Sequence, residues 1–289
     1  MKRTNLFSQF ILITLLLINS SCKNEPDNVT ISSDGVNISF DNQGEGEPTL
    51  IFIHGWTNNK TIWDAQMSHF SKKYNVVAID LAGSGLSGNN RQQWTIPAFS
   101  EDVIAVINKL DLDKIVLVGF SMGAPVALET AKNVPDKVIG IVIVDSFHNV
   151  EMKYTPEIIH YMDSIFMGVA TDPTMEKLQP FFRNNKEVSF ERILSMFNDS
   201  DRTGWRESLH DNFRWENDEL IPSLDQIKAP IIAINSDQQP TNIETFKKYV
   251  PSFKAHIIPD VGHVVMWDAP EEFNRLLEES INDFLKDQN

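Results

Sequence analysis

The sequence predicts an α/β fold in which a parallel sheet carries helices on both faces. Continuous apolar runs recur along the chain, and strands of this kind are buried on both faces, as in a parallel sheet. Helical stretches lie between these runs, and alternation of strand and helix is typical of this fold class. The apolar runs span residues 49–54, 75–80, 114–119, 138–145, 230–235 and 254–259.

The N-terminal segment has the features of a secretory signal peptide over residues 1–21. Two basic residues, Lys2 and Arg3, precede an apolar run over 10–18 and a short stretch of small residues. The apolar run is too short to span a bilayer comfortably as a mature helix. An uncleaved N-terminal anchor is the alternative.

Cys22 is the only cysteine of the chain and follows the predicted signal peptide directly. The segment Asn19-Ser20-Ser21-Cys22 resembles a bacterial lipobox, although Asn19 stands where an aliphatic residue is commoner. A lone cysteine cannot form an internal disulfide, so lipidation explains it better than a structural role. We therefore expect residues 22–28 to be a lipidated tether of an exported, membrane-anchored lipoprotein of a bacterial cell envelope. A secreted or periplasmic protein is the alternative.

The charge balance argues against nucleic acid as a partner. Removal of residues 1–21 leaves 23 basic and 40 acidic residues, a net charge of −17. Such a surface repels phosphate backbones and anionic lipid headgroups.

The segments after the tether divide into a core, residues 29–150 and 223–289, and an insertion. In the core, residues 29–40 predict a hairpin with a turn at Asp34-Gly35. Helices are expected at 97–110, 122–133 and 270–286.

Residues 151–222 contain no strand-like run and predict a helical cap inserted between two strands. We expect this cap to lie over the carboxyl ends of the strands, where ligands bind in such sheets. Most of its large aromatic residues must form its own core, and one or two are expected to line a pocket. These residues are Phe166, Phe181, Phe182, Phe190, Phe197, Trp205, Phe213 and Trp215.

Residues 119–123, Gly-Phe-Ser-Met-Gly, lie between a predicted strand and a predicted helix. G-x-S-x-G in this context is a nucleophile elbow, a tight turn that projects the hydroxyl of Ser121 above the sheet. Gly119 and Gly123 keep side chains away from the backbone of the turn. The helix N-terminus next to Ser121 favours negative charge.

Two further segments complete the candidate site. His54-Gly55-Trp56 follows the strand at 49–54, so the backbone N–H groups of Trp56 and Met122 are the expected oxyanion-hole donors. His263 lies in a loop between the last strand and the last helix, from which it can reach Ser121 as a base.

The motifs HGW, DLAGSGLS, GFSMGAP, IVIVD and DVGH occur in this order, and with them the chain from about residue 30 to its end resembles the α/β-hydrolase superfamily. The resemblance implies an eight-stranded, mostly parallel sheet, a cap after strand six and a Ser–acid–His triad. Asp80 precedes Ser121 and therefore does not fit the order of the triad, so we expect it to hold loops together.

Residues 83–88 also match the dinucleotide fingerprint G-x-G-x-x-G. The polar residues that follow do not open a helix that could hold a pyrophosphate. A dinucleotide-dependent oxidoreductase is retained as a weak alternative.

Two carboxylates are candidates for the acid of the triad. The resemblance places the commonest acid position after strand seven, and there the sequence has Gln239, with Asp237 two residues early. Asp145 ends the preceding strand, and haloalkane dehalogenases and pancreatic-type lipases are similar in placing their acid there. We therefore predict Asp145 as the acid and keep Asp237 as the alternative. His148 is expected to be a loop residue under the cap.

These residues predict a serine hydrolase that cleaves a carboxylic ester or related small acyl substrate through an acyl-enzyme. A serine nucleophile excludes the dehalogenase and epoxide-hydrolase chemistries, which need an aspartate. C–C bond hydrolysis, lactonase or perhydrolase activity on the same triad is the nearest alternative, and a non-catalytic surface binding protein is another. No metal-ligand spacing or P-loop is found, so the sequence implies no cofactor.

Overall fold

The computed structural model describes residues 28–178, 181–183 and 186–287. The predicted signal peptide and Cys22 lie outside these residues. Within them, no helix combines the length and the apolar character needed to cross a membrane.

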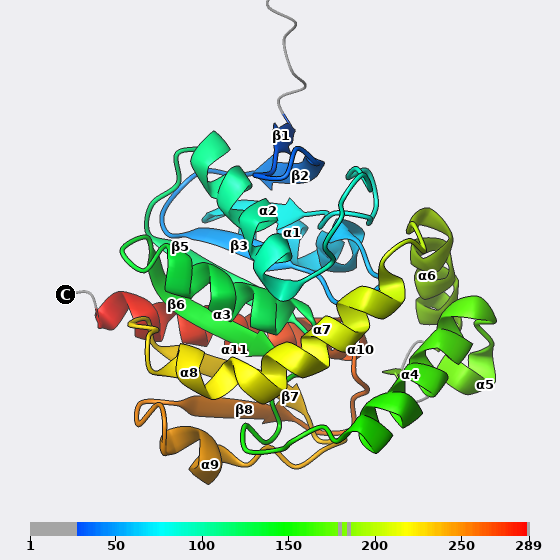
Figure 1. Cartoon of the computed structure of the whole chain (residues 1–289). Coiled ribbons are helices and arrows are strands. Elements are labelled where there is room, and N and C mark those ends of the chain that lie inside the picture. Colours follow the sequence, from blue (N-terminus) through cyan, green and yellow to red (C-terminus); the bar gives the residue numbers. More distant parts are fainter. Residues whose placement is uncertain (1–27, 179–180, 184–185, 288–289) are drawn as a thin grey trace, which may run out of the picture.

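One eight-stranded sheet forms the centre of the molecule, with the strand order β1-β2-β4-β3-β5-β6-β7-β8 (Figure 1). Neighbouring strands from β4 to β8 are parallel, whereas β1–β2 and β2–β4 are antiparallel, so the sheet is mixed. The strands are β1 Val29–Ile31, β2 Asn37–Gln43, β3 Thr49–Ile53, β4 Asn75–Ile79, β5 Ile115–Phe120, β6 Val138–Val144, β7 Ile231–Ser236 and β8 Lys254–Ile258.

The predicted hairpin and buried strands are found with one exception. β1 and β2 pair around the Asp34-Gly35 turn, with Val29 opposite Ser39. β3, β5, β6 and β7 are buried at every position. The expectation of full burial is wrong for β8, which is the edge strand and leaves Ile257 42% exposed.

Helices cover both faces of the sheet and form a hydrophobic core on each. Alternate residues of a strand point to opposite faces, so Ile51 and Ile53 of β3 join one core and Leu50 and Phe52 join the other. In Figure 1, α2 and α3 lie in front of the sheet and α11 lies behind it. The helices of the core are η1 Lys60–Trp63, α1 Asp64–Phe70, α2 Ile96–Lys109, α3 Gly123–Asn133, α9 Ile243–Lys247, α10 Val265–Asp268 and α11 Pro270–Lys286.

The chain between β6 and β7 is helical. The helices are α4 Pro156–Thr171, α5 Met175–Leu178, α6 Lys186–Asp199, α7 Trp205–Asp218 and α8 Leu220–Leu224. α7 and α8 pack near α3, whereas α4, α5 and α6 lie to one side of the sheet (Figure 1). The helices of this segment therefore lie between β6 and β7 in the chain, and the role of residues 151–222 as a cap stays a prediction.

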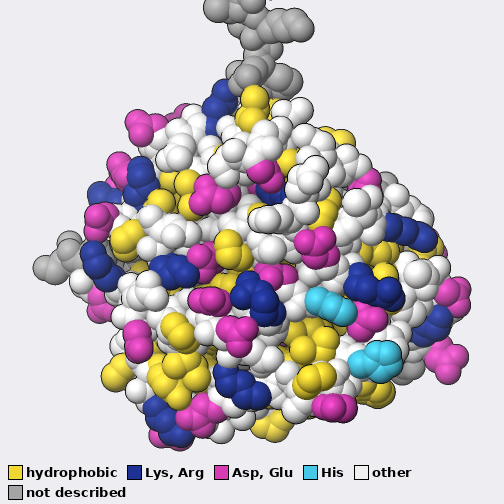
Figure 2. Space-filling view, viewed as in Figure 1, with side chains coloured by type: hydrophobic (Ala, Val, Ile, Leu, Met, Phe, Trp, Pro, Cys, Tyr) yellow, Lys and Arg dark blue, Asp and Glu magenta, His cyan; other side chains and the backbone are white. Residues whose placement is uncertain are grey.

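The surface in Figure 2 mixes acidic and basic side chains. On this face, no continuous basic patch is seen that a nucleic-acid backbone would need.

Candidate active site

Ser121 lies in a strained turn between β5 and α3. Its φ is +51°, in the left-handed region that non-glycine residues rarely occupy. The turn is fixed on both sides, because Ser121 N–H donates to Val144 O at 3.0 Å and Ala124 N–H donates to Ser121 O at 2.9 Å. Backbone strain of this kind costs about 1–3 kcal/mol and occurs mostly at functional sites.

The glycines on either side of Ser121 are required by close backbone packing. A Cβ at Gly119 would lie 2.3 Å from the carbonyl oxygen of Gly123, and one at Gly123 would lie 2.5 Å from that of Ile53. Both distances are too short for any side chain. Gly119 is therefore required by close packing within the turn, and Gly123 by the packing of the turn against the end of β3.

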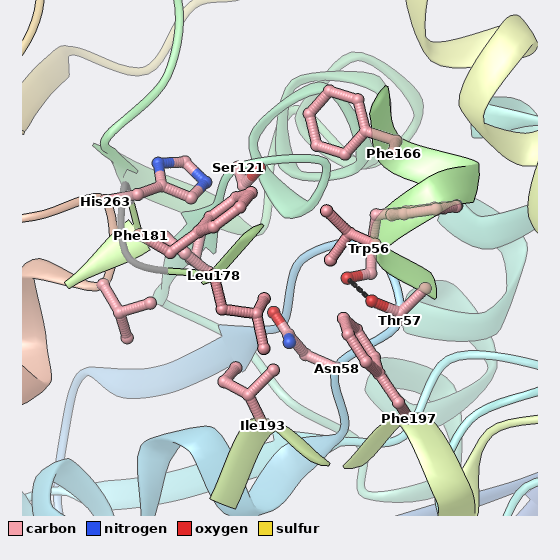
Figure 3. Close-up of a pocket in the computed structure, with 13 residues that line it drawn as sticks. Trp56, Thr57, Asn58, Ser121, Phe166, Leu178, Phe181, Ile193, Phe197 and His263 are labelled. Carbon is pink, nitrogen blue, oxygen red and sulfur yellow. Dashed lines mark hydrogen bonds between the residues drawn. The ribbon is translucent and has the colours of Figure 1, made fainter. Parts of the chain in front are cut away.

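The imidazole of His263 is oriented by Asp145. His263 Nδ1 donates to Asp145 Oδ2 at 2.6 Å, which leaves Nε2 free to accept a proton. The ring also packs against Phe120 and Phe181, at centroid distances of 4.8 and 5.8 Å. His263 and Ser121 line the same cavity (Figure 3), although the structure has no hydrogen bond between them. In unliganded enzymes such bonds are often long and tighten when substrate binds.

Asp145 follows β6 directly and is only 4% exposed. Its Oδ1 accepts a hydrogen bond of 2.6 Å from Ser236 N–H, which fixes the carboxylate. Burial raises the pKa of Asp145, but the hydrogen bond and charge of His263, together with Ser236 N–H and His148, outweigh burial and hold this pKa below its usual value. Asp145 is therefore charged at neutral pH. Like Ser121, it has a positive φ, +44°.

Both carboxylate oxygens of Asp237, the alternative acid, accept hydrogen bonds from groups other than His263. Its Oδ1 accepts from Arg183 Nη1 at 3.2 Å, and its Oδ2 accepts from Asp260 N–H at 3.2 Å. Gln239 lines the same cleft as His263. His148 lies 3.8 Å from Asp145 Oδ1, and burial lowers the pKa of His148 despite this neighbour.

The two predicted oxyanion donors lie beside Ser121. The loop after β3 approaches closely, since a Cβ at Gly55 would be 3.1 Å from Ser121 Cβ. Trp56 and Met122 line the cleft together with Ser121. Among the described residues, neither backbone N–H of this pair donates a hydrogen bond, so both are available to a ligand.

A buried network that the sequence analysis did not find supports this loop. His54 donates from Nδ1 to Gly55 O at 2.8 Å and accepts from Leu81 N–H at Nε2 at 3.1 Å, which requires a neutral ring. Burial lowers the pKa of His54 and favours the same form. Lys60 forms a buried ion pair with Asp80 at 2.7 Å, so Asp80 holds loops together as expected.

Two spaces meet at Ser121. The first, called here the apolar pocket, has a volume of about 490 Å³ and is shown in Figure 3. Nine of its thirteen lining residues are apolar, and six of these nine come from the helical segment between β6 and β7. These six residues are Phe166, Val169, Leu178, Phe181, Ile193 and Phe197. Three of the aromatic residues singled out in the sequence therefore line this pocket, more than expected.

The second space, called here the wide cleft, has a volume of about 1380 Å³ and opens to solvent. Ser121, His263 and Asp145 lie on one wall and residues of α7 on another. One of these, Glu216, carries a carboxyl group that the sequence analysis did not single out. Within the described part of the chain, no three His, Cys, Asp or Glu side chains come together as metal ligands.

The glycines of residues 83–88 are explained by packing inside the protein. A Cβ at Gly83 would lie 2.7 Å from the Trp94 ring, and one at Gly85 would lie 2.4 Å from the carboxylate of Asp80. Asp80 also accepts from Leu86 N–H at 3.0 Å, which closes the loop on itself.

A model of the α/β hydrolase family matches residues 50–276, and the chain belongs to this family. The matched range contains Ser121, Asp145 and His263. Family membership and the Acinetobacter baylyi hydrolase described next support an enzyme of the hydrolase type.

The relatives differ in how much of the chain they match. The (E)-2-((N-methylformamido)methylene)succinate hydrolase of Acinetobacter baylyi is 23% identical over 242 residues, covering 82% of this chain and 90% of the relative. An uncharacterized protein of Mycobacterium tuberculosis is 29% identical over 112 residues, covering 39% of this chain and only 33% of that protein. A thermophilic esterase from Thermogutta terrifontis has a TM-score of 0.75 at 22% identity, covering 89% of this chain and 98% of the esterase, and this likeness shows the shared fold.

Proposed function

We propose that this protein is a serine hydrolase that cleaves a carboxylic ester or a related acyl substrate. One observation carries the proposal: Ser121, on its strained turn, lines the same cavity as His263, whose Nδ1 donates to the buried carboxylate of Asp145. Nucleophile, base and orienting acid are the three parts that acyl transfer through serine requires.

In the proposed mechanism, Ser121 Oγ attacks the substrate carbonyl while His263 Nε2 takes the hydroxyl proton. Asp145 keeps the imidazole in the required tautomer and stabilises its positive charge. The N–H groups of Trp56 and Met122 bind the oxyanion. His263 then gives the proton to the leaving alcohol, and a water molecule activated by the same histidine hydrolyses the acyl-enzyme.

The apolar pocket suits the acyl chain of the substrate. Apart from the reacting groups Ser121 and His263, its polar lining residues are Thr57 and Asn58. The Thr57 hydroxyl donates to Trp56 O at 2.7 Å, and Asn58 Nδ2 contacts Met196 Sδ at 3.9 Å. A hydrocarbon chain matches the apolar side chains that form most of the lining. Residues 151–222, which supply most of these apolar side chains, are on this proposal the substrate-binding cap of the enzyme.

The chemistry is tested with a fluorophosphonate probe, which reacts with activated serines. We expect the purified protein to be labelled at Ser121 and the Ser121→Ala variant to remain unlabelled. A wild-type protein that is not labelled would contradict the enzyme proposal and favour the surface binding protein. A panel of p-nitrophenyl esters of increasing chain length then measures the acyl preference. Lactone and perhydrolase substrates assayed beside it test the alternatives on the same triad.

The proposal places the enzyme on a membrane through a lipid on Cys22. The test is mass spectrometry of the mature N-terminus after expression in a bacterial host. We expect a chain that starts at Cys22 and carries acyl groups, and a Cys22→Ser variant that lacks them. An unmodified mature chain would leave a secreted or periplasmic enzyme.

A further inference from the structure

The wall of the wide cleft contains one carboxyl group that the proposed mechanism does not use, Glu216 of α7. Among the described residues, two carboxyl groups line this cleft, those of Asp145 and Glu216. Asp145 is held by His263 and Ser236, whereas Glu216 has no ion pair with any Lys or Arg of the described residues. No Lys or Arg is among the residues described as lining the cleft. A buried or partly buried carboxylate is normally paired with a cation.

The neighbours of Glu216 are neutral and hold it in one orientation. Asn212 Nδ2 donates to its Oε1 at 2.7 Å, and the Tyr154 hydroxyl donates to its Oε2 at 3.2 Å. Asn212 Oδ1 is buried and has no hydrogen-bond partner among the described residues. Glu216 is therefore held by neutral donors alone, with no positive charge among its hydrogen-bond partners.

Burial disfavours the charged form of the Glu216 carboxyl group. It raises the pKa of Glu216 to about 7, although the hydrogen bonds from Asn212 and Tyr154 act in the opposite direction. A cation placed beside Glu216 would reverse this effect, because an opposite charge within a few ångströms favours the charged form of an acid.

Aromatic rings next to Glu216 add a second kind of affinity for a cation. Tyr154 and Phe213 pack with their centroids 4.8 Å apart, and both line the cleft together with Phe147. Ring faces attract ammonium groups, by about 0.5–2 kcal/mol depending on solvation.

Because Glu216 lines the wide cleft and not the apolar pocket, a cation bound there belongs to the part of the substrate that occupies the wide cleft. The apolar pocket and the wide cleft share Trp56, Ser121, Phe166, Phe181 and His263. A substrate bound at Ser121 thus extends into both spaces, and Glu216 belongs to the wide cleft alone. The acyl chain takes the apolar pocket, so the leaving group takes the wide cleft.

We infer that Glu216, with Asn212 and Tyr154, binds a positively charged nitrogen in the leaving group, so that the preferred substrates are esters of cationic amino alcohols. The assignment of the cation to the leaving group rests on the proposed function. The binding of a cation at Glu216 does not require catalysis.

The first test therefore measures binding without turnover. Calorimetry is run with phenyltrimethylammonium and, as the uncharged match, with tert-butylbenzene. We expect the wild-type protein to bind the cation and the Glu216→Gln variant, which keeps the side-chain shape, to bind it about tenfold more weakly, because the attraction between two opposite charges is lost. The control Glu219→Gln removes a carboxylate at the end of the same helix that does not line the cleft, and should bind as the wild type does.

The second test compares two esters that differ in charge alone, the 2-(trimethylammonio)ethyl ester and the 3,3-dimethylbutyl ester of the same acid. The wild-type enzyme should prefer the cationic ester in kcat/KM, and Glu216→Gln should lose this preference through KM. The control Glu219→Gln should keep the preference, and fluorophosphonate should label its Ser121 at the wild-type rate. Wild-type protein that binds no cation, or a preference that Glu216→Gln leaves unchanged, would overturn the inference. Failure of labelling at Ser121 would instead overturn the proposed function.

Discussion

Replacement of Asp145 by asparagine is the sharpest test of the proposed triad. The amide introduced by Asp145→Asn can still accept from Ser236 N–H through its oxygen, so the packing around this 4% exposed side chain is retained. The amide nitrogen, however, can only donate and faces His263 Nδ1, which in the wild-type protein donates to the carboxylate at 2.6 Å. The imidazole must then move its proton to Nε2, where it can no longer accept the proton of Ser121. Loss of the correct tautomer and of the negative charge is expected to lower kcat by about 10⁴.

The assay is steady-state hydrolysis of a p-nitrophenyl ester by Asp145→Asn and by the matched variant Asp237→Asn. Asp237 contacts Arg183 and Asp260 N–H, so its replacement should leave kcat within a few-fold of the wild-type value. Circular dichroism confirms that both variants are folded. The reasoning is refuted if Asp237→Asn abolishes kcat while Asp145→Asn retains it, since the acid would then be the one after β7.

Three further predictions concern stability. Gly123→Ala places a Cβ 2.5 Å from Ile53 O and should lower the free energy of unfolding by about 1–3 kcal/mol, measured by urea denaturation; an unchanged midpoint would show that the turn relaxes. Lys60→Met leaves the buried carboxylate of Asp80 without its partner and should cost about 3–5 kcal/mol in the same assay, whereas a loss below about 1 kcal/mol would show that water or another group replaces the lysine. Because the pKa of Glu216 is raised from 4.5 to about 7, the folded state binds this proton more tightly than the unfolded state, and wild-type stability should fall relative to Glu216→Gln as pH rises through this window. Parallel stability profiles of the two proteins between these pH values would contradict the raised pKa.

Much of the fold follows from the local pattern of the sequence. The apolar runs at 49–54 and 114–119 are long enough and sufficiently apolar to specify buried strands, and the structure has β3 and β5 there. Sequence pattern does not give the neighbours of a strand, however. The run at 254–259 resembles the others, but β8 has a partner on one side only and is therefore partly exposed. The short helices α9 and α10 were also not predicted, because four or five residues give too little periodicity.

The candidate site likewise contains residues that the sequence predicts and residues that it does not. The Ser121 turn could be predicted because its tight backbone constrains five consecutive residues. These residues can be recognised in the sequence as G-x-S-x-G. The contact between His263 and Asp145 joins residues 118 positions apart, and only chain order pointed to it. No sequence pattern marks Glu216 as a residue of the cleft, since one acidic residue in an amphipathic helix is ordinarily a solvated surface group. Its position in the cleft depends on how α7 packs over the sheet.

Asp237, at the end of β7, contacts Arg183 and Asp260 N–H, whereas Asp145, at the end of the neighbouring strand β6, contacts His263. Asp237 connects Arg183, which precedes α6, to the turn at Asp260 shortly before His263, while Arg183 N–H also donates to Asp268. Changes at this position therefore reach the pocket wall and the histidine loop without removing a reacting group. On the proposed mechanism the acid lies at the end of the adjacent strand β6, so the loop after β7 can change in sequence without loss of a reacting group.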